Sequence, residues 1–227
     1  MTAAIRIHEL RVRLGGRPVV DRVSFTLEPG EARALVGPNG SGKTTVLRAV
    51  LGLVPYEGTV AILGRDARRE PIAARAAIGY VPQRPSFGDA TALEALVLIA
   101  RLRRLPASRA RELLALVDLA EHAEARAATF SGGMQQRLSL AVAMMGDPAV
   151  LLLDEPSASL DRAARGRFLE TVQRLRVDGH TLLIASHRDD EIVGLTDGVI
   201  HLEDGRLTTP RHAASNVLPL FRRGASA

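Results

Sequence analysis

A glycine-rich segment at residues 37–45 has the residue types and the spacing that bind the phosphates of a nucleotide. It fits the P-loop pattern G-x-x-x-x-G-K-[ST], in which backbone N–H groups surround a triphosphate. Its members are Gly37, Pro38, Asn39, Gly40, Ser41, Gly42, Lys43, Thr44 and Thr45. Lys43 is the only lysine among 30 lysine and arginine residues. A compact ammonium suits a phosphate cradle better than a guanidinium, so we expect Lys43 to bridge the β- and γ-phosphates of a triphosphate.

Two carboxylates follow the apolar residues 150–153, which predict a buried strand. Ligands bind at the carboxyl ends of strands in open α/β sheets, and Asp154 and Glu155 stand at such an end. We expect Asp154 and the Thr44 hydroxyl to hold Mg²⁺, and Glu155 to accept a proton from the attacking water. An ordinary polar turn after a strand is the structural alternative. The P-loop argues against it, because phosphoryl transfer needs both a metal and an oriented water.

A second candidate anion site lies where Ser131, Gly132 and Gly133 open a predicted helix. Taken alone, a serine N-cap explains this turn. One chain does not need two phosphate cradles for one nucleotide. Two chains arranged head to tail would need both, because the P-loop of each would then face the Ser-Gly-Gly turn of the other.

The segments around these motifs alternate between predicted strands and helices. Strands are expected at residues 5–14, 23–27, 32–36, 58–63, 77–81, 150–153, 181–185, 199–202 and 205–207, and helices at residues 42–51, 91–145 with a break at Pro106, and 162–177. In the first strand, apolar and polar residues alternate with an irregularity at residues 8–9, which predicts a β-bulge and antiparallel pairing through a turn at residues 15–16. Thr91 and Glu94 have the spacing of a capping box at a helix start.

This order of elements predicts an α/β fold. We expect a P-loop NTPase core with a mostly parallel, helix-covered sheet, an N-terminal antiparallel β subdomain and an inserted helical subdomain. The whole chain, residues 1–227, is expected to form a single domain. Its core and β subdomain would span about residues 1–85 and 146–207, and its helical subdomain would span about residues 86–145. Residues 208–227 would form a loosely ordered tail.

Composition narrows the class of protein. The net charge of +5 permits an anionic partner, but the arginines are scattered among acidic residues and aromatics make up only 3% of the chain, so we expect no nucleic-acid binding. The absence of cysteine excludes disulfides and thiolate metal sites. No apolar stretch is long enough to span a bilayer, and the N-terminus lacks the apolar core of a signal peptide.

Together the motifs resemble those of ATP-binding-cassette (ABC) ATPases, the nucleotide-binding subunits of ABC transporters, over roughly residues 4–207. The further landmarks are Gln83 in a segment similar to the Q-loop, residues 130–134 similar to the signature motif, residues 154–156 similar to the Walker B end, residues 159–161 similar to the D-loop, and His187 similar to the switch histidine. Their order and spacing match those of the family.

The resemblance implies the roles of these residues. ATP and Mg²⁺ would be the cofactors, and the catalytic set would be Glu155, His187, Gln83 and Lys43. Gln83 would sense Mg²⁺ and the attacking water, and would bind the metal together with Thr44 and Asp154. The ATP-binding set would join the P-loop to Ser131, Gly132, Gly133 and Leu14.

Three positions depart from the family pattern. Leu14 stands where the family usually places an aromatic that stacks on adenine. Either Arg13 or Arg17 stacks on the base instead, or base selectivity is loose. Met134 replaces the commoner glutamine after the Ser-Gly-Gly turn, as in many exporter-type members, and Phe130 replaces the usual leucine.

The resemblance implies an ATP-hydrolysing subunit that powers transport through separate membrane-spanning subunits by ATP-driven head-to-tail dimerisation. The expected direction of transport is export. The subunit would be cytoplasmic and peripheral at the inner face of the membrane, paired with a second ABC ATPase subunit as a homodimer. Residues 84–106, including Phe87, would contact the membrane partner. The alternatives are an importer ATPase for metal or another solute, an ABC ATPase of assembly or cell division that moves no solute, and a nucleotide-binding regulator with little turnover. Retention of Glu155 and His187 counts against the regulator.

Overall fold

Two β-sheets organise the chain in this computed structural model, which describes residues 2–158, 160–187 and 194–208. The smaller sheet has the strand order β2-β1-β4-β5 and is antiparallel throughout. Its strands are β1 (Ile5–Leu14), β2 (Arg17–Leu27), β4 (Glu57–Ile62) and β5 (Arg65–Asp66). The register of β1 shifts around Glu9, where φ is 50°, which confirms the predicted bulge.

The larger sheet has the strand order β10-β9-β3-β8-β7-β6 and is parallel except for β10 at its edge. Its strands are β3 (Ala32–Val36), β6 (Ile78–Val81), β7 (Val150–Asp154), β8 (Thr181–Ser186), β9 (Gly198–Glu203) and β10 (Arg206–Thr208). Every residue of β7 and β8 is buried. Central parallel strands with both faces covered require such apolar runs, so the predicted mostly parallel sheet is confirmed.

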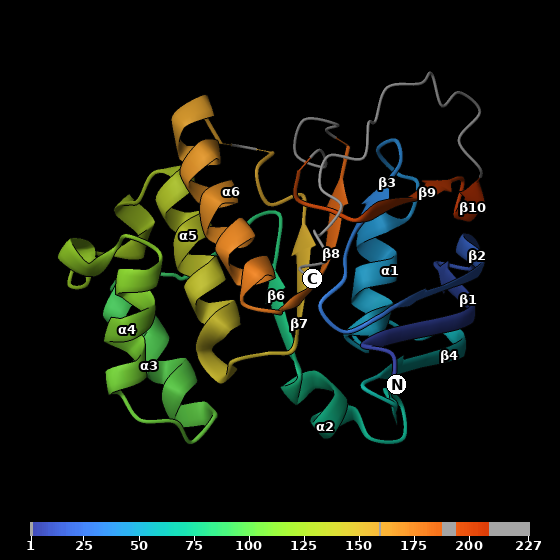
Figure 1. The fold of residues 1–227 in the computed structure, drawn as a ribbon, viewed down its shortest axis with the longest axis horizontal. Helices are drawn as coiled ribbons and strands as arrows, with labels where there is room; N and C mark the ends of the chain where they lie inside the picture. Colours follow the sequence, from blue (N-terminus) through green and yellow to red (C-terminus); the bar gives the residue numbers. More distant parts are fainter. Residues whose placement is uncertain (1, 159, 188–193, 209–227) are drawn as a thin grey trace, which may run out of the picture.

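The helices lie on both sides of this sheet (Figure 1). They are α1 (Lys43–Val50), α2 (Pro71–Ala76), α3 (Ala92–Leu102), α4 (Ser108–Leu116), α5 (Gly132–Ala143) and α6 (Arg162–Val177), with short 3₁₀ turns at Ala120–His122, Ala127–Thr129 and Met144–Gly146. The predicted capping box is present, because Thr91 Oγ1 accepts from the Glu94 N–H and the Glu94 carboxylate accepts from the Thr91 N–H. Helix α2 was not predicted, since six residues are too few to show a period. None of the described helices combines the length and apolar character needed to cross a bilayer.

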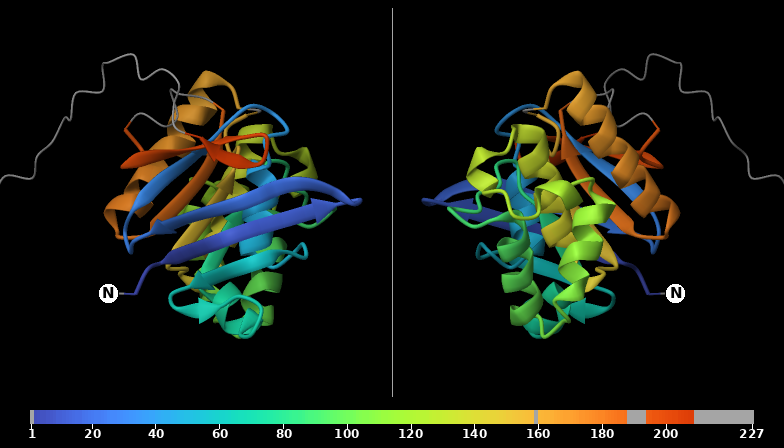
Figure 2. Two further views of the ribbon diagram at one scale, coloured as in Figure 1. Left: turned by 90° about the vertical axis from the view of Figure 1, so that its right-hand side faces the viewer. Right: turned by 90° about the vertical axis from the view of Figure 1, so that its left-hand side faces the viewer.

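Two apolar clusters cover opposite faces of the parallel sheet. Leu151 and Leu153 belong to the cluster that joins the sheet to α3–α6, and Val150 and Leu152 to the cluster that joins it to α1 and the antiparallel sheet. Alternate residues of a strand point to opposite faces, so β7 contributes to both. Figure 2 shows the result, with the antiparallel sheet on one side of the molecule and the helices α3–α5 on the other.

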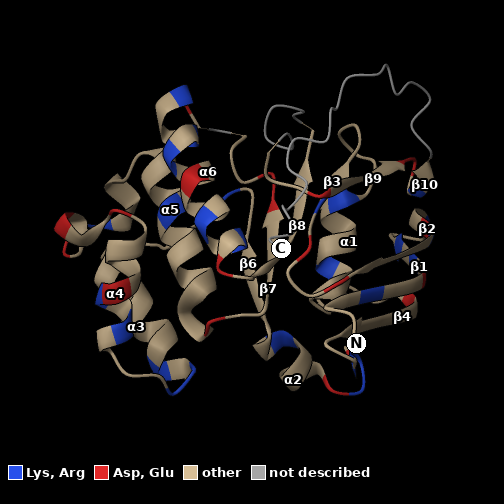
Figure 3. Cartoon of the chain, in the orientation of Figure 1, with Lys and Arg blue, Asp and Glu red and all other residues tan. Residues whose placement is uncertain are grey.

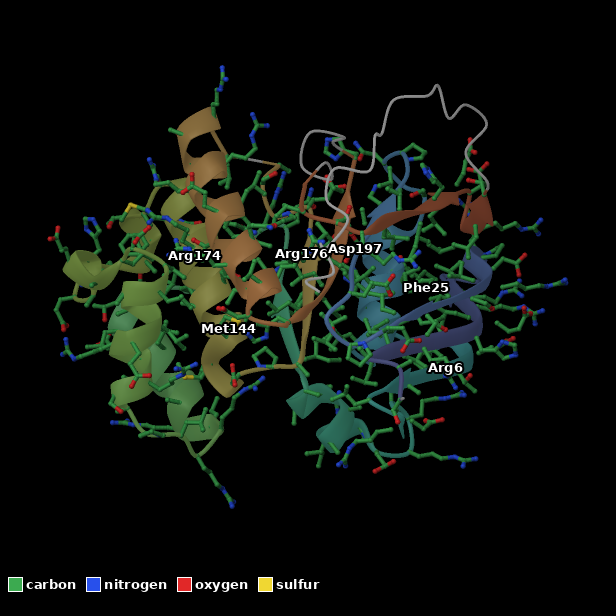
Figure 4. The ribbon with its side chains drawn as sticks, in the orientation of Figure 1. Arg6, Phe25, Met144, Arg174, Arg176 and Asp197 are labelled. Carbon is green, nitrogen blue, oxygen red and sulfur yellow. The ribbon has the colours of Figure 1, made fainter. Side chains whose placement is uncertain are left out.

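Side-chain contacts fix α6 to the parallel sheet. Arg176 of α6 donates to a carboxylate oxygen of Asp197, and the other oxygen of Asp197 accepts the Ala32 N–H of β3 at 2.9 Å. Figure 4 shows Arg176 and Asp197 next to each other, and Figure 3 shows basic and acidic residues interspersed along the chain.

The division into a core and an inserted helical subdomain stays a prediction. The helices α3–α5 fall within residues 86–145, yet they share one apolar cluster with α6 and β7. Most of the predicted tail, residues 209–227, lies outside the described residues.

Candidate active site

A pocket of about 470 Å³ lies at the N-terminus of α1 and the carboxyl ends of the parallel strands. Residues far apart in the sequence line it together: Val19, Asn39, Gly40, Gly42, Lys43, Thr44, Thr45, Gln83, Glu155, Ala158 and His187. Parallel strands end at the same edge of the sheet, so the segments after β3, β6, β7 and β8 meet there. The pocket therefore joins the P-loop to the predicted catalytic residues.

The P-loop backbone requires glycine where α1 begins. Gly42 has a φ of 104°, and a Cβ on it would lie 2.9 Å from the carbonyl oxygen of Val19. Helix α1 starts at the next residue, which directs the positive end of the helix at the pocket. The Ser41 hydroxyl is buried and has no hydrogen-bond partner among the described residues. An oxygen-rich ligand such as a phosphate fits this loop, because it would supply the missing partner.

Lys43 is buried beneath this loop with its ammonium fully engaged. Its Nζ donates to the carbonyl oxygens of Gly37 at 2.8 Å and Pro38 at 3.1 Å, and lies 3.4 Å from Glu155 Oε1. An ammonium has three N–H donors, so these contacts account for all of them. Phosphate oxygens reaching Lys43 would replace some of these contacts.

Glu155 is the point on which the predicted catalytic residues converge. Its φ of 46° is unusual for a side-chain-bearing residue and costs about 1–2 kcal/mol. Its carboxylate accepts from Gln83 Nε2 at 3.2 Å, lies 3.1 Å from His187 Nδ1, and pairs with Lys43. A carboxylate held by three groups from different loops has a fixed orientation, as a general base requires.

Asp154 is buried at the end of β7 with both oxygens engaged. Oδ1 accepts from Thr44 Oγ1 at 2.9 Å, and Oδ2 accepts from the Tyr80 hydroxyl at 3.2 Å. Burial raises the pKa of Asp154, and these two hydrogen bonds act in the opposite direction. Burial beside Asp154 also raises the pKa of Tyr80, so its hydroxyl stays protonated and can donate.

The donor set fits a hard divalent cation. Thr44 and Asp154 place a hydroxyl and a carboxylate together beside the phosphate loop, and Mg²⁺ prefers oxygen ligands of this kind next to substrate phosphates. Gln83 directs its amide nitrogen at Glu155, so its predicted contact with the metal stays a prediction.

Several predicted site residues lie outside this pocket. Ser131 and Gly132 are exposed at the start of α5, where Ser131 Oγ accepts the Met134 N–H at 3.3 Å. Leu14 is 39% exposed at the end of β1 and is absent from the pocket lining. The roles of Ser131, Gly132, Gly133 and Leu14 in binding ATP stay predictions. Of the D-loop-like segment, residue 159 lies outside the described residues, and Asp161 caps α6.

The structure also adds residues that the sequence analysis missed. Val19 and Ala158 line the pocket, and the Tyr80 hydroxyl contacts Asp154. No motif includes Val19, since it reaches the pocket only through the packing of β2 against the P-loop. One sequence feature could have identified Tyr80 as a site residue, namely its position three residues before Gln83 on a predicted strand.

Comparison with known proteins identifies the family of the chain. Residues 20–158 match the ABC transporter family. The Nod factor export ATP-binding protein I of Paraburkholderia xenovorans is 39% identical over 90% of this chain and 69% of its own length. The linearmycin resistance ATP-binding protein LnrL of Bacillus subtilis is 34% identical over 89% of this chain and 67% of its own length.

A solved structure described as the ATP-binding subunit of an ABC transporter is 27% identical and has a TM-score of 0.82, over 91% of this chain and 88% of its own. The fold is therefore the one that the resemblance implied. The chain thus belongs to the ABC transporter ATP-binding family, whose members hydrolyse ATP to power transport.

Proposed function

We propose that this chain is the ATP-hydrolysing subunit of an export ABC transporter and acts as a homodimer that closes head to tail around ATP and Mg²⁺. The convergence of Lys43, Gln83 and His187 on Glu155 carries the proposal. It joins the phosphate loop, the predicted base and the side chains of Gln83 and His187 in one open pocket.

Hydrolysis would follow from the contacts in this pocket. The N–H groups at the start of α1 and the Lys43 ammonium would hold the phosphates. Thr44 and Asp154 would hold Mg²⁺, which neutralises phosphate charge when bound. Glu155 would then orient the attacking water and take its proton, while His187 would donate toward the γ-phosphate.

The exposed start of α5 supports the head-to-tail arrangement. Ser131 and Gly132 present the positive end of a twelve-residue helix to the surface, outside the pocket of their own chain. A second copy could place this helix start over the phosphates bound by the first. Each of the two ATP sites would then be built from both chains.

Two of the relatives support export, because their names refer to Nod factor export and to linearmycin resistance. We place the contact with the membrane-spanning subunits at residues 84–106. This segment follows Gln83 directly, and Phe87 is partly buried against the apolar cluster of α3–α6. Movement of a partner on this segment would reach Glu155 through Gln83. The chain would then sit on the cytoplasmic side, at the inner face of the membrane.

A complementation experiment tests the shared sites. Lys43→Ala removes the P-loop cation, and Ser131→Arg fills the helix start with a bulky side chain. Neither variant should hydrolyse ATP alone. Mixed dimers carry one site with an intact P-loop from one chain and an intact helix start from the other, so phosphate release should return on mixing. If the mixture stays inactive while each variant remains folded, the head-to-tail arrangement is wrong.

The partner and the direction of transport need a separate test. We expect a membrane-spanning protein to co-purify with the chain from its native membrane. Reconstituted with that partner, it should accumulate cargo in inside-out vesicles in an ATP-dependent manner. Release of preloaded cargo from such vesicles would contradict export.

A further inference from the structure

Tyr80 contacts Asp154, the aspartate predicted to bind Mg²⁺, but is not among the predicted site residues. It lies on β6, three residues before Gln83, and its hydroxyl donates to Asp154 Oδ2 at 3.2 Å. The pairing partner of Tyr80 across the sheet is Leu152, two residues before Asp154. The tyrosine side chain therefore reaches along the sheet toward its carboxyl edge.

One strand end thus contacts both carboxylates of the site. Tyr80 donates to Asp154, and Gln83 donates to Glu155. The two carboxylates are neighbours in sequence, and the two donors follow one another on and just after β6. A shift of β6 relative to β7 would therefore move one hydrogen-bond donor away from each carboxylate.

Asp154 has no ready replacement for this contact. The residue is only 2% exposed, so water is a poor substitute for a lost hydrogen bond. Thr44 holds Oδ1, and Tyr80 holds Oδ2. Removing the tyrosine hydroxyl would leave one buried carboxylate oxygen without its donor and free the carboxylate to turn about its axis.

We propose that Tyr80 is a positioning residue that holds the Asp154 carboxylate in the orientation that binds Mg²⁺ beside the nucleotide. The inference rests on the metal-binding role of Asp154 in the proposed function. Hydrogen-bond partners behind a metal-binding carboxylate typically contribute a factor of about 10–100 to metal affinity. A tyrosine that only fills space would contribute nothing to this affinity.

Tyr80→Phe tests the proposal, because it removes one oxygen and keeps the ring. The chain has two tyrosines, so Tyr56→Phe is a matched control. The Tyr56 side chain lies outside the pocket and packs against Arg68, which is not a residue of the candidate site. We expect Tyr80→Phe to raise the Mg²⁺ concentration for half-maximal ATP binding and hydrolysis about tenfold, with Tyr56→Phe unchanged. Binding is measured by calorimetric titration of ATP at a series of Mg²⁺ concentrations.

Tyrosine emission gives a second readout that needs no change at Tyr80. The chain has no tryptophan, so in the Tyr56→Phe protein Tyr80 is the only tyrosine emitter. We expect its emission to change when Mg²⁺ is added in the presence of ATP, because the carboxylate that accepts its hydrogen bond then meets the metal. Adding Asp154→Asn should abolish this response. The measurement still decides the question if Tyr80→Phe does not fold.

The outcomes separate the inference from the proposed function. If the unmodified chain shows no Mg²⁺-dependent ATP binding, the role of Asp154 fails and the inference fails with it. If it shows such binding and Tyr80→Phe has the same Mg²⁺ requirement, only the positioning role is overturned. A constant emission of Tyr80 during the Mg²⁺ titration would overturn it as well.

Discussion

Replacing Glu155 with glutamine removes the charge at the centre of the site while keeping its size. The Glu155 side chain is 10% exposed and lies 3.4 Å from the Lys43 ammonium, whose own side chain is 5% exposed. An amide oxygen can still accept from Gln83 or His187. The variant therefore separates the charge and the basicity of Glu155 from its shape.

The expected loss of stability follows from the partners that Lys43 keeps. Breaking a buried ion pair by removing one charge costs about 3–5 kcal/mol. The carbonyl oxygens of Gly37 and Pro38 still accept from Lys43, and the pocket is open, so we expect a lower cost of about 2 kcal/mol. For a chain of this size that cost lowers Tm by about 4–8 °C.

Nucleotide should reverse this loss, because phosphate oxygens give Lys43 a new negative partner. At 100 times its Kd, a ligand stabilises the folded state by about 2.7 kcal/mol. The Tm of Glu155→Gln should therefore rise at least as much with MgATP as the Tm of the unmodified chain. Its turnover should fall about 10²–10⁴-fold, the usual contribution of a general base.

Thermal melting with and without MgATP, together with phosphate release, measures these effects. Glu57→Gln is the matched control, since Glu57 is 70% exposed and pairs with Arg11 at 3.7 Å on the surface. Exposed pairs contribute about 0–1 kcal/mol, so this control should keep both its Tm and its turnover. Wild-type turnover in Glu155→Gln would show that Glu155 is not the base. An equal loss of Tm in both variants would show that the Lys43–Glu155 pair is not a buried one in solution.

Three further changes test other parts of the structure. Gly42→Ala should abolish ATP binding in a titration, because its Cβ would meet the Val19 carbonyl at a φ that disfavours alanine; retained affinity would contradict the loop geometry. Burial raises the pKa of Asp154 in the folded chain, so ionising this carboxyl lowers stability once the pH rises above the pKa that the group has in the unfolded chain. Asp154→Asn should therefore raise the Tm of the nucleotide-free chain at neutral pH, and this gain should shrink in acid. The same variant should lose Mg²⁺-dependent hydrolysis. Thr91→Ala removes the N-cap of α3 and should cost about 1 kcal/mol in a denaturant titration, with ATP affinity unchanged; a larger loss would mean that the cap supports more than this helix.

The sequence was sufficient to predict features that lie within one short segment of the chain. The P-loop, the buried strand ending in Asp154 and Glu155, the bulge in β1 and the capping box at Thr91 each lie within a few residues of the chain. Local rules of periodicity, glycine conformation and capping apply to such segments directly. The family resemblance rests on the same segments, and the comparisons confirm it.

Contacts between distant segments could be found only in the tertiary structure. The approach of Tyr80 to Asp154 depends on the pairing of β6 with β7, and the pairing of Lys43 with Glu155 depends on the positive φ that follows β7. Val19 reaches the pocket because the antiparallel sheet packs against the P-loop. Leu14, which the family resemblance assigned to the base, lies outside the pocket lining. Sequence spacing states which residues are available. Which of them meet is decided by the register of the strands and by the packing of one sheet on another, because these bring together residues that no local pattern relates.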